Sequence, residues 1–249
     1  MVQTGPWITQ TKAQPRLRLF CFPYAGGGAA IYRTWQEQFP AEIEVCPVHL
    51  PGRESRIKEA PYTRLAPLIE ALAQALEPFM YIPFAFFGHS MGTLISFELA
   101  RHLRRRHAPM PVRLFVAAHR APQLPDRGEP QYLLPDDELI DSLRRLGGTP
   151  PAILQHEELM RIVLSILRAD FELCETYVYT PEEPLDLPIS AYGGEQDTLV
   201  SRQELQAWAL QTQRAFTLDM LAGNHFFLQS QQPLLLQNIA QQLQCYVSA

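Results

Sequence analysis

The pentapeptide Gly88-His89-Ser90-Met91-Gly92 has the Gly-x-Ser-x-Gly spacing in which a serine hydroxyl can act as a nucleophile. It follows the apolar run Phe84–Phe87, which is typical of a buried strand, and it opens a helical pattern from Met91 onward. A sharp turn between strand and helix would strain the backbone at Ser90 and project its hydroxyl outward. A serine that only caps a helix needs no flanking glycines. We therefore interpret Ser90 as the nucleophile of an acyl-transfer reaction.

A serine nucleophile needs a base, and His225 is the candidate among the seven histidines. It lies in the loop Leu221–Phe227, between the last predicted strand and the last predicted helix. An α/β-hydrolase places its histidine there, third in chain order. The neighbouring His89 should point elsewhere. The other histidines lie in less suitable places: at the end of an Arg-rich helix (His102 and His107), at a strand end (His119), in the insertion (His156) and before a loop (His49).

The acid that orients the histidine should lie between Ser90 and His225, at the carboxyl end of a strand. The segment 193–197 follows the predicted strand Ile189–Tyr192 and offers two carboxylates, Glu195 and Asp197. Two further acids, Asp170 and Glu172, fall on a predicted helix of the insertion, and we interpret them as surface charges.

Stabilising the oxyanion of the reaction requires two backbone donors. The N–H of Met91 is one, because it follows the nucleophile. The second should come from the glycine-rich loop 24–28 after the first predicted strand, and we assign it to the N–H of Ala25. A phosphate-binding loop is the alternative for these glycines, but the segment lacks the Gly-Lys-Ser/Thr ending.

Short β-rich runs alternate with helical patterns, which predicts βαβ units and a mostly parallel sheet flanked by helices. The predicted strands are Arg16–Phe22, Ile43–Val48, Phe84–Phe87, Arg113–Ala118, Ile189–Tyr192 and Phe216–Leu221. The predicted helices are Ile31–Phe39, Leu65–Met80, Met91–Arg106 and two near the carboxyl end, beginning at Arg202 and Pro233. We expect a single domain over residues 1–249.

One stretch, residues 124–184, interrupts this alternation. It holds two helical patterns, Asp136–Leu146 and His156–Tyr177, separated by the breaker cluster Gly147–Pro151. An insertion of this length is usually functional, so we expect a helical lid. Its apolar residues could line an acyl channel or simply pack together: Leu139, Leu143, Ile162 and Leu167.

The composition argues against several function classes. The 249 residues carry a formal net charge of −5, which gives no global attraction to nucleic acid or to an anionic membrane. The four cysteines form no Cys-x-x-Cys pair, and neither a signal peptide nor a segment of transmembrane length is visible. We expect a cytoplasmic monomer without a metal site.

Together these residues resemble the type II thioesterases that accompany nonribosomal peptide and polyketide synthases. The resemblance covers nearly the whole chain and rests on six segments in the family's order: 22–27, Leu50-Pro51-Gly52-Arg53-Glu54, the pentapeptide at Ser90, Arg120-Ala121-Pro122, Gly193-Gly194-Glu195-Gln196-Asp197 and 223–227. It selects Asp197 over Glu195 as the acid. The family commonly has His where this chain has Tyr24, which leaves any role of that side chain in doubt.

The resemblance implies an α/β-hydrolase fold with residues 124–184 as the lid. The substrates would be acyl thioesters on the phosphopantetheine arm of acyl or peptidyl carrier proteins, removed to edit stalled or aberrant chains. The arm belongs to the substrate, so no cofactor of the enzyme's own is implied. Tyr24, Gly26 and Arg53 would contact the substrate, although a structural salt bridge is an alternative for Arg53.

Two other functions remain open on the sequence alone. A free-standing carboxylesterase or lipase would use the same three residues, and a non-catalytic adaptor that binds carrier proteins could keep the fold. The basic run formed by Arg101 with Arg104-Arg105-Arg106 could dock an acidic carrier helix, or it could be a solvated helix end.

Overall fold

The computed structural model describes residues 7–9, 14–125, 128–148 and 151–247. Its centre is a sheet in which the strand order is β2-β1-β3-β4-β5-β6 and every neighbouring pair is parallel. The strands are β1 (Leu17–Phe22), β2 (Ile43–Pro47), β3 (Phe84–His89), β4 (Leu114–Ala117), β5 (Ile189–Gly194) and β6 (Phe216–Leu221). All six predicted strands are confirmed, and each observed end lies within two residues of the predicted one.

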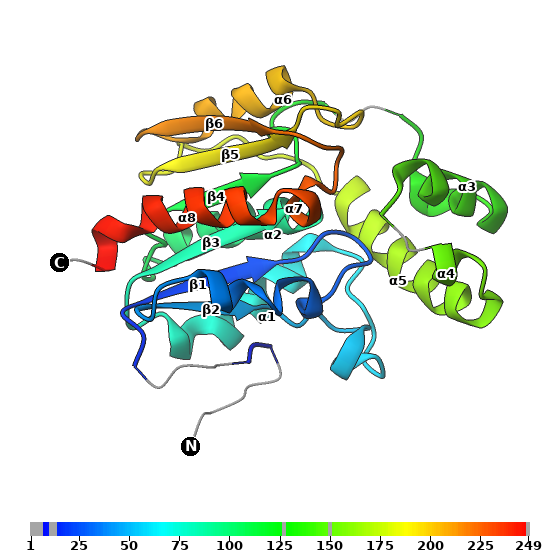
Figure 1. Cartoon of the computed structure of the whole chain (residues 1–249), viewed down its shortest axis with the longest axis horizontal. Helices are drawn as coiled ribbons and strands as arrows, with labels where there is room; N and C mark the ends of the chain where they lie inside the picture. Colours follow the sequence, from blue (N-terminus) through cyan, green and yellow to red (C-terminus); the bar gives the residue numbers. More distant parts are fainter. Residues whose placement is uncertain (1–6, 10–13, 126–127, 149–150, 248–249) are drawn as a thin grey trace.

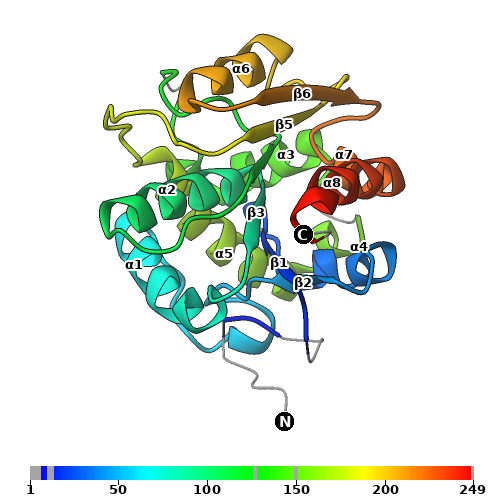
Figure 2. The ribbon, with the colours of Figure 1, turned by 90° about the vertical axis from the view of Figure 1, so that its left-hand side faces the viewer.

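Helices cover both faces of this sheet (Figure 2). On one face, α1 (Leu65–Leu76), α2 (Met91–Arg105) and α6 (Arg202–Gln206) pack against alternate residues of the strands. On the other face lie α7 (Phe227–Ser230) and α8 (Gln232–Val247). The central strands β1, β3 and β4 are buried along their full length, as continuous apolar runs covered on both sides should be.

The segment Ile31–Phe39 differs from its predicted single helix. It forms two short 3₁₀ helices, η1 (Ala29–Tyr32) and η2 (Trp35–Gln38). Gln36 explains the difference, because its side-chain amide accepts a hydrogen bond from the N–H of Val45 at 2.9 Å and donates one to the carbonyl of Ile43 at 3.1 Å. Tertiary contacts with β2 therefore override the local helical pattern.

Three helices between β4 and β5 gather beyond one end of the sheet (Figure 1). They are α3 (Asp136–Leu146), α4 (Pro151–Leu154) and α5 (Glu157–Glu175), and they share a small core made of Leu139, Leu143, Met160, Leu164 and Leu167. The helical patterns of the insertion are confirmed, while its function as a lid stays a prediction. Thr149 and Pro150 of the breaker cluster lie outside the described residues.

The crossing of β1, β3 and α2 is so tight that side chains are excluded from it. A Cβ added to Gly92 would overlap the carbonyl of Phe22 in β1, and one added to Gly88 would overlap the backbone of Gly92. The two glycines therefore set the distance between the strand that ends at His89 and the helix that follows it.

We predict that Gly92→Ala destabilises the fold by about 1–3 kcal/mol, the usual cost of overpacking, and lowers catalytic activity because α2 must shift away from β1. Urea unfolding monitored by circular dichroism measures the loss. Ala66→Ser is the control, because it adds one heavy atom at an exposed position of α1 where nothing is overpacked. Equal stability losses in both variants would contradict the close-approach argument.

Candidate active site

Ser90 occupies the turn between β3 and α2 with φ 52° and ψ −116°, outside the regions that L-residues favour. Its N–H donates to the carbonyl of Ala117 at 2.8 Å, which ties the turn to β4. The strained backbone is held by the surrounding sheet, as is usual where a side chain must be presented for reaction. The structure thus places Ser90 on the sharp strand-to-helix turn that its sequence context predicts.

Asp197 and His225 lie side by side on the loops that follow β5 and β6. His225 Nδ1 is 2.9 Å from Asp197 Oδ2, and the Asp197 side chain is fully buried. The other carboxylate oxygen accepts hydrogen bonds from the N–H groups of Leu199 and Val200 at 2.8 and 3.3 Å. With Nδ1 occupied by Asp197, the Nε2 of His225 is the ring nitrogen left for proton transfer. Glu195, the alternative acid, is exposed.

Close packing of the two loops holds this pair together. The N–H of Gln196 donates to the carbonyl of Gly223 at 2.9 Å, and the N–H of Gly223 donates to the side chain of Gln196 at 2.5 Å. A Cβ at Gly194 would overlap the carbonyls of Gly223 and Asn224. Glycine is required there because the chain after β5 runs against the backbone before His225.

Ser90 and His225 open into one cavity of about 230 Å³. Tyr24, Ala25 and Gly26 line it on the side of β1. Most of its apolar wall comes from the inserted helices and their flanking residues, namely Leu143, Leu146, Ile153, Val163, Leu167 and Phe171. Of the four apolar residues named from the sequence, Leu143 and Leu167 therefore face this cavity. Leu139 is buried in the insertion's own core, and Ile162 is about half exposed.

The two predicted oxyanion donors are the N–H of Ala25, a residue that lines this cavity, and the N–H of Met91, the residue that follows Ser90. Among the residues that the structure describes, the N–H groups of Ala25 and Met91 have no hydrogen-bond acceptor. The next N–H along the loop, that of Gly26, is already engaged by Asp170 at 2.7 Å. Gly26 thus lines the cavity as predicted, while its donor faces α5.

Arg53 and Asp170 form a buried ion pair beneath the glycine-rich loop, and two sequence-based expectations change. The two terminal nitrogens of Arg53, Nη1 and Nη2, each lie 2.7 Å from an oxygen of the Asp170 carboxylate. The side chains of Arg53 and Asp170 are 5% and 3% exposed. Arg53 therefore forms the structural salt bridge that was the alternative to substrate contact. Its guanidinium is bound to Asp170 and is not free to contact the phosphate of a phosphopantetheine arm. Reading Asp170 as a surface charge was wrong, whereas Glu172 pairs near the surface with Arg64.

A sequence signal for the burial of Asp170 was present. It lies three residues after Leu167 and three before Leu173, on the same side of α5 as these two buried leucines. A charged residue in an apolar stripe requires a partner, since an isolated buried charge is strongly unfavourable.

Residues 17–243 match the family model of the thioesterase domain. The chain belongs to the thioesterase family. It is 46% identical to the gramicidin S biosynthesis protein GrsT of Aneurinibacillus migulanus, over 97% of this chain and 95% of GrsT.

Solved structures of thioesterases agree with the fold. RedJ, a thioesterase from the prodiginine biosynthetic pathway of Streptomyces coelicolor, superposes with a TM-score of 0.86 at 41% identity, covering 91% of this chain and 90% of RedJ. BorB, the type II thioesterase of the borrelidin biosynthetic cluster, gives 0.89 at 36% identity over 98% of this chain and all of BorB. The α/β-hydrolase fold and the hydrolase class expected from the sequence are confirmed.

His89 supports the active site of this thioesterase in a way that the sequence analysis missed. It lies on the same side of β3 as Ala85 and Phe87, facing α7 and α8, and is fully buried. Its Nε2 is 2.9 Å from the carbonyl of His225. Its Nδ1 is buried without a hydrogen-bond partner. Burial, and then the nearby His225, lower the pKa of His89 well below its usual value, so the ring is neutral and donates to His225.

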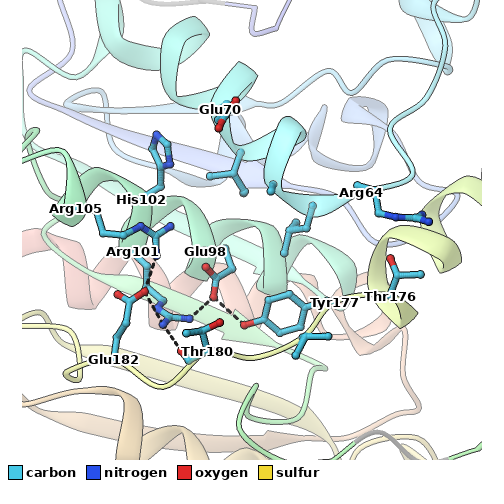
Figure 3. A pocket seen from close by; sticks show the side chains of 14 residues that line it. Arg64, Glu70, Glu98, Arg101, His102, Arg105, Thr176, Tyr177, Thr180 and Glu182 are labelled. Carbon is cyan, nitrogen blue, oxygen red and sulfur yellow. Dashed lines mark hydrogen bonds and ion pairs between the residues drawn. The ribbon is translucent and has the colours of Figure 1, made fainter.

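A second cavity, of about 550 Å³, lies between α1, α2 and the segment after α5 (Figure 3). Arg101 is buried there between Glu98, the carbonyl of Thr180 and Glu182, and Tyr177 donates to Glu98 at 2.8 Å. Arg104 and Arg105 of the basic run also pair with Glu182. These three arginines therefore bind the segment between α5 and β5 to α2, and only Arg106 of the run is exposed without such a contact among the described residues.

Within the described ranges, no group of three or more His, Cys, Asp or Glu side chains is arranged to hold a metal ion. Nor does any helix in those ranges combine the length and apolar character needed to cross a membrane.

We predict that the buried, neutral His89 makes the protein less stable in mild acid. The unfolded chain protonates His89 near pH 6.5 while the folded chain does not, so stability is lost as pH falls from about 7 toward 5, by up to about 1.4 kcal/mol per pH unit. His89→Gln, which keeps a donor for the His225 carbonyl, should make that slope shallower in urea unfolding at stepped pH.

The slope should not vanish in His89→Gln, because burial also lowers the pKa values of His49 and His102. His107→Gln, at an exposed position, is the control and should keep the wild-type slope. An unchanged slope in His89→Gln would show that His89 does not titrate in the way we infer.

Proposed function

We propose that this thioesterase hydrolyses acyl thioesters from the phosphopantetheine arms of acyl or peptidyl carrier proteins. Its role would be to unload stalled or aberrant acyl groups during nonribosomal peptide or polyketide biosynthesis. The main support is that Ser90 and His225, which is hydrogen-bonded to Asp197, line one cavity together with apolar side chains of the inserted helices. Such a site suits an acyl chain attached to a reactive carbonyl.

The proposed reaction has two steps that use the same residues. His225 Nε2 takes the proton of Ser90 as Oγ bonds to the thioester carbonyl carbon, and Asp197 holds the imidazole in the correct tautomer. When the tetrahedral intermediate collapses, the C–S bond breaks and His225 returns the proton to the departing sulfur. Water, deprotonated by His225, then attacks the acyl-serine and releases the carboxylic acid and free Ser90.

The N–H groups of Met91 and Ala25 would bind the oxyanion formed in both steps. Neither N–H has a hydrogen-bond acceptor among the described residues, and donors of this kind contribute about 3 kcal/mol each to the transition state in other hydrolases. The leaving group is a thiol with a pKa of about 8.5, so its departure depends less on proton transfer than that of an alcohol.

The proposal assigns the phosphopantetheine to the carrier protein and no cofactor to the enzyme. Two relatives support a carrier-bound substrate, since BorB is a type II thioesterase of a biosynthetic cluster and RedJ is a thioesterase of a biosynthetic pathway. We place the enzyme in the cytoplasm as a monomer, which is consistent with its free cysteines. Family membership and these relatives favour this function over a free-standing carboxylesterase and over a non-catalytic adaptor.

We predict that Ser90→Ala abolishes turnover and covalent labelling by a fluorophosphonate, because no other group at the cavity replaces the nucleophile. The unfolding midpoint should stay close to that of the wild type. Ser96→Ala, on the same helix and buried against the carbonyl of Thr93, is the matched control and should remain active. Labelling of Ser90→Ala at the wild-type rate would contradict the assignment.

We also predict that carrier-bound acyl groups are hydrolysed with a higher kcat/KM than the same acyl group on a small oxygen ester. Mass spectrometry of acylated carrier proteins before and after incubation measures the first rate, and release of 4-nitrophenol measures the second. A preference for the small ester across a panel of acyl lengths would favour a carboxylesterase.

A further inference from the structure

The strongest unexplained feature near the active site is the buried ion pair between Arg53 and Asp170. It joins three parts of the chain: the loop after β2, helix α5 of the insertion, and the glycine-rich loop after β1. The two side chains make more contacts than an ion pair needs. Asp170 Oδ2 also accepts from the N–H of Gly26 at 2.7 Å, and Arg53 also donates to the carbonyl of Gly27 at 3.1 Å.

The glycine-rich loop at this point is a tight turn. The N–H of Gly27 donates to the carbonyl of Tyr24 at 2.9 Å, and Gly26 has φ +76°, the pattern of a type II turn with glycine at its third position. Asp170 holds the N–H of the peptide between Ala25 and Gly26, and Arg53 holds the carbonyl of Gly27. The bond to Asp170 resists a flip of the central peptide, and the bond from Arg53 holds the chain where it leaves the turn.

A second contact from α5 acts on the same residue. A Cβ on Gly26 would lie 2.7 Å from Cδ2 of Leu167, so the turn is pressed against the helix. Leu167 and Asp170 are three residues apart and therefore share one side of α5. Leu167 packs against Gly26, and Asp170 accepts a hydrogen bond from the N–H of Gly26.

From these contacts we infer that Arg53 and Asp170 are positioning residues for the oxyanion donor at Ala25. This inference rests on the proposed function, in which that N–H binds the oxyanion. Neither side chain would touch the substrate. Asp170 fixes the peptide on one side of Ala25, and the Tyr24–Gly27 hydrogen bond closes the turn. Ala25 itself lines the cavity, and its N–H has no acceptor among the described residues.

The inference gives the insertion a part in catalysis besides covering the acyl chain. A donor must lie within a few tenths of an ångström of its place to stabilise a developing charge, and a misplacement near 1 Å can reduce the rate about a hundredfold. Because α5 supplies Asp170, the geometry of the oxyanion donor depends on where α5 packs. Substrate affinity depends mainly on the apolar wall and should not share this dependence.

The test compares variants of the buried pair with a matched pair far from Ser90. Arg18 and Glu44, near the amino ends of β1 and β2, are joined at 3.0 Å with side chains 2% and 0% exposed. Asp170→Asn removes the charge beneath the turn, and Glu44→Gln makes the same change at the opposite edge of the sheet. Steady-state hydrolysis of an acyl-pantetheine and inhibition by a trifluoromethyl ketone analogue of it provide the readouts.

We expect kcat of Asp170→Asn to fall at least about tenfold with KM within about twofold of the wild type. The affinity for the trifluoromethyl ketone, whose adduct with Ser90 carries the oxyanion, should fall by a similar factor. Glu44→Gln should keep kcat within about twofold although its unfolding midpoint also drops. Equal kcat in the two variants would overturn the inference.

The double variant Arg53→Met/Asp170→Leu separates positioning from folding. Replacing both charges by apolar side chains removes the unpaired buried charge, so its unfolding midpoint should return toward that of the wild type. Its kcat should stay low, because nothing then holds the N–H of Gly26. Recovery of kcat together with stability would overturn the inference, and this variant decides the question if Asp170→Asn does not fold. A wild-type enzyme that hydrolyses no acyl thioester would reject the proposed function itself, and the inference with it.

Discussion

The site depends on how closely α2 approaches the sheet at Gly88 and Gly92. Because neither residue has a side chain, the helix begins directly above the ends of β1 and β3. Ser90 must then turn through a left-handed conformation, and its hydroxyl emerges at the carboxyl edge of the sheet. The same approach brings the N–H of Met91 next to the loop after β1. The positions of the nucleophile and of the Met91 donor therefore follow from one steric constraint.

The remaining groups reach Ser90 because every strand of the sheet is parallel. In a parallel sheet all carboxyl ends meet at one edge, so the loops after β1, β5 and β6 converge although they are far apart in the sequence. The hydrogen bonds between residues 194–197 and 221–224 then bring Asp197 to His225, and the buried His89 holds the His225 backbone from below. Each residue of the site is thus fixed by backbone contacts of a neighbouring loop.

Much of this arrangement could be predicted from local sequence. The strand Phe84–His89, for example, begins with an unbroken apolar run. The two glycines of the Gly-x-Ser-x-Gly spacing indicate that strand and helix approach too closely for side chains at those positions. The nucleophile, acid and base were assigned to Ser90, Asp197 and His225 from their positions along the chain and from a family resemblance. The structure brings Asp197 and His225 into contact. Choosing between Glu195 and Asp197 required the resemblance, since both follow the same strand and only their orientation differs.

What the sequence could not provide were interactions between distant segments. The helical pattern at Ile31–Phe39 breaks because Gln36 bonds to β2, and Arg101 is buried because Glu182 reaches it from the segment before β5. The apolar side of α5 indicates that Asp170 is buried, but local sequence cannot identify its partner Arg53, which lies 117 residues away in the chain. In each case a polar side chain found a partner that no window of local sequence contains.

The reacting groups and the apolar wall of the cavity come from different parts of the chain, and this affects which substrates the site can distinguish. The reacting groups belong to the sheet, while the apolar wall belongs largely to α3, α4 and α5. Apolar walls discriminate weakly, since one methylene changes binding by about 1–3 kcal/mol. Polar groups that would reject particular acyl chains are few among the wall residues, so under the proposed function we expect the site to accept chains of differing length and branching. That tolerance fits the proposed unloading of aberrant acyl groups, whose structures vary. Selection of the correct partner would then fall to surfaces that contact the carrier protein rather than to the acyl pocket.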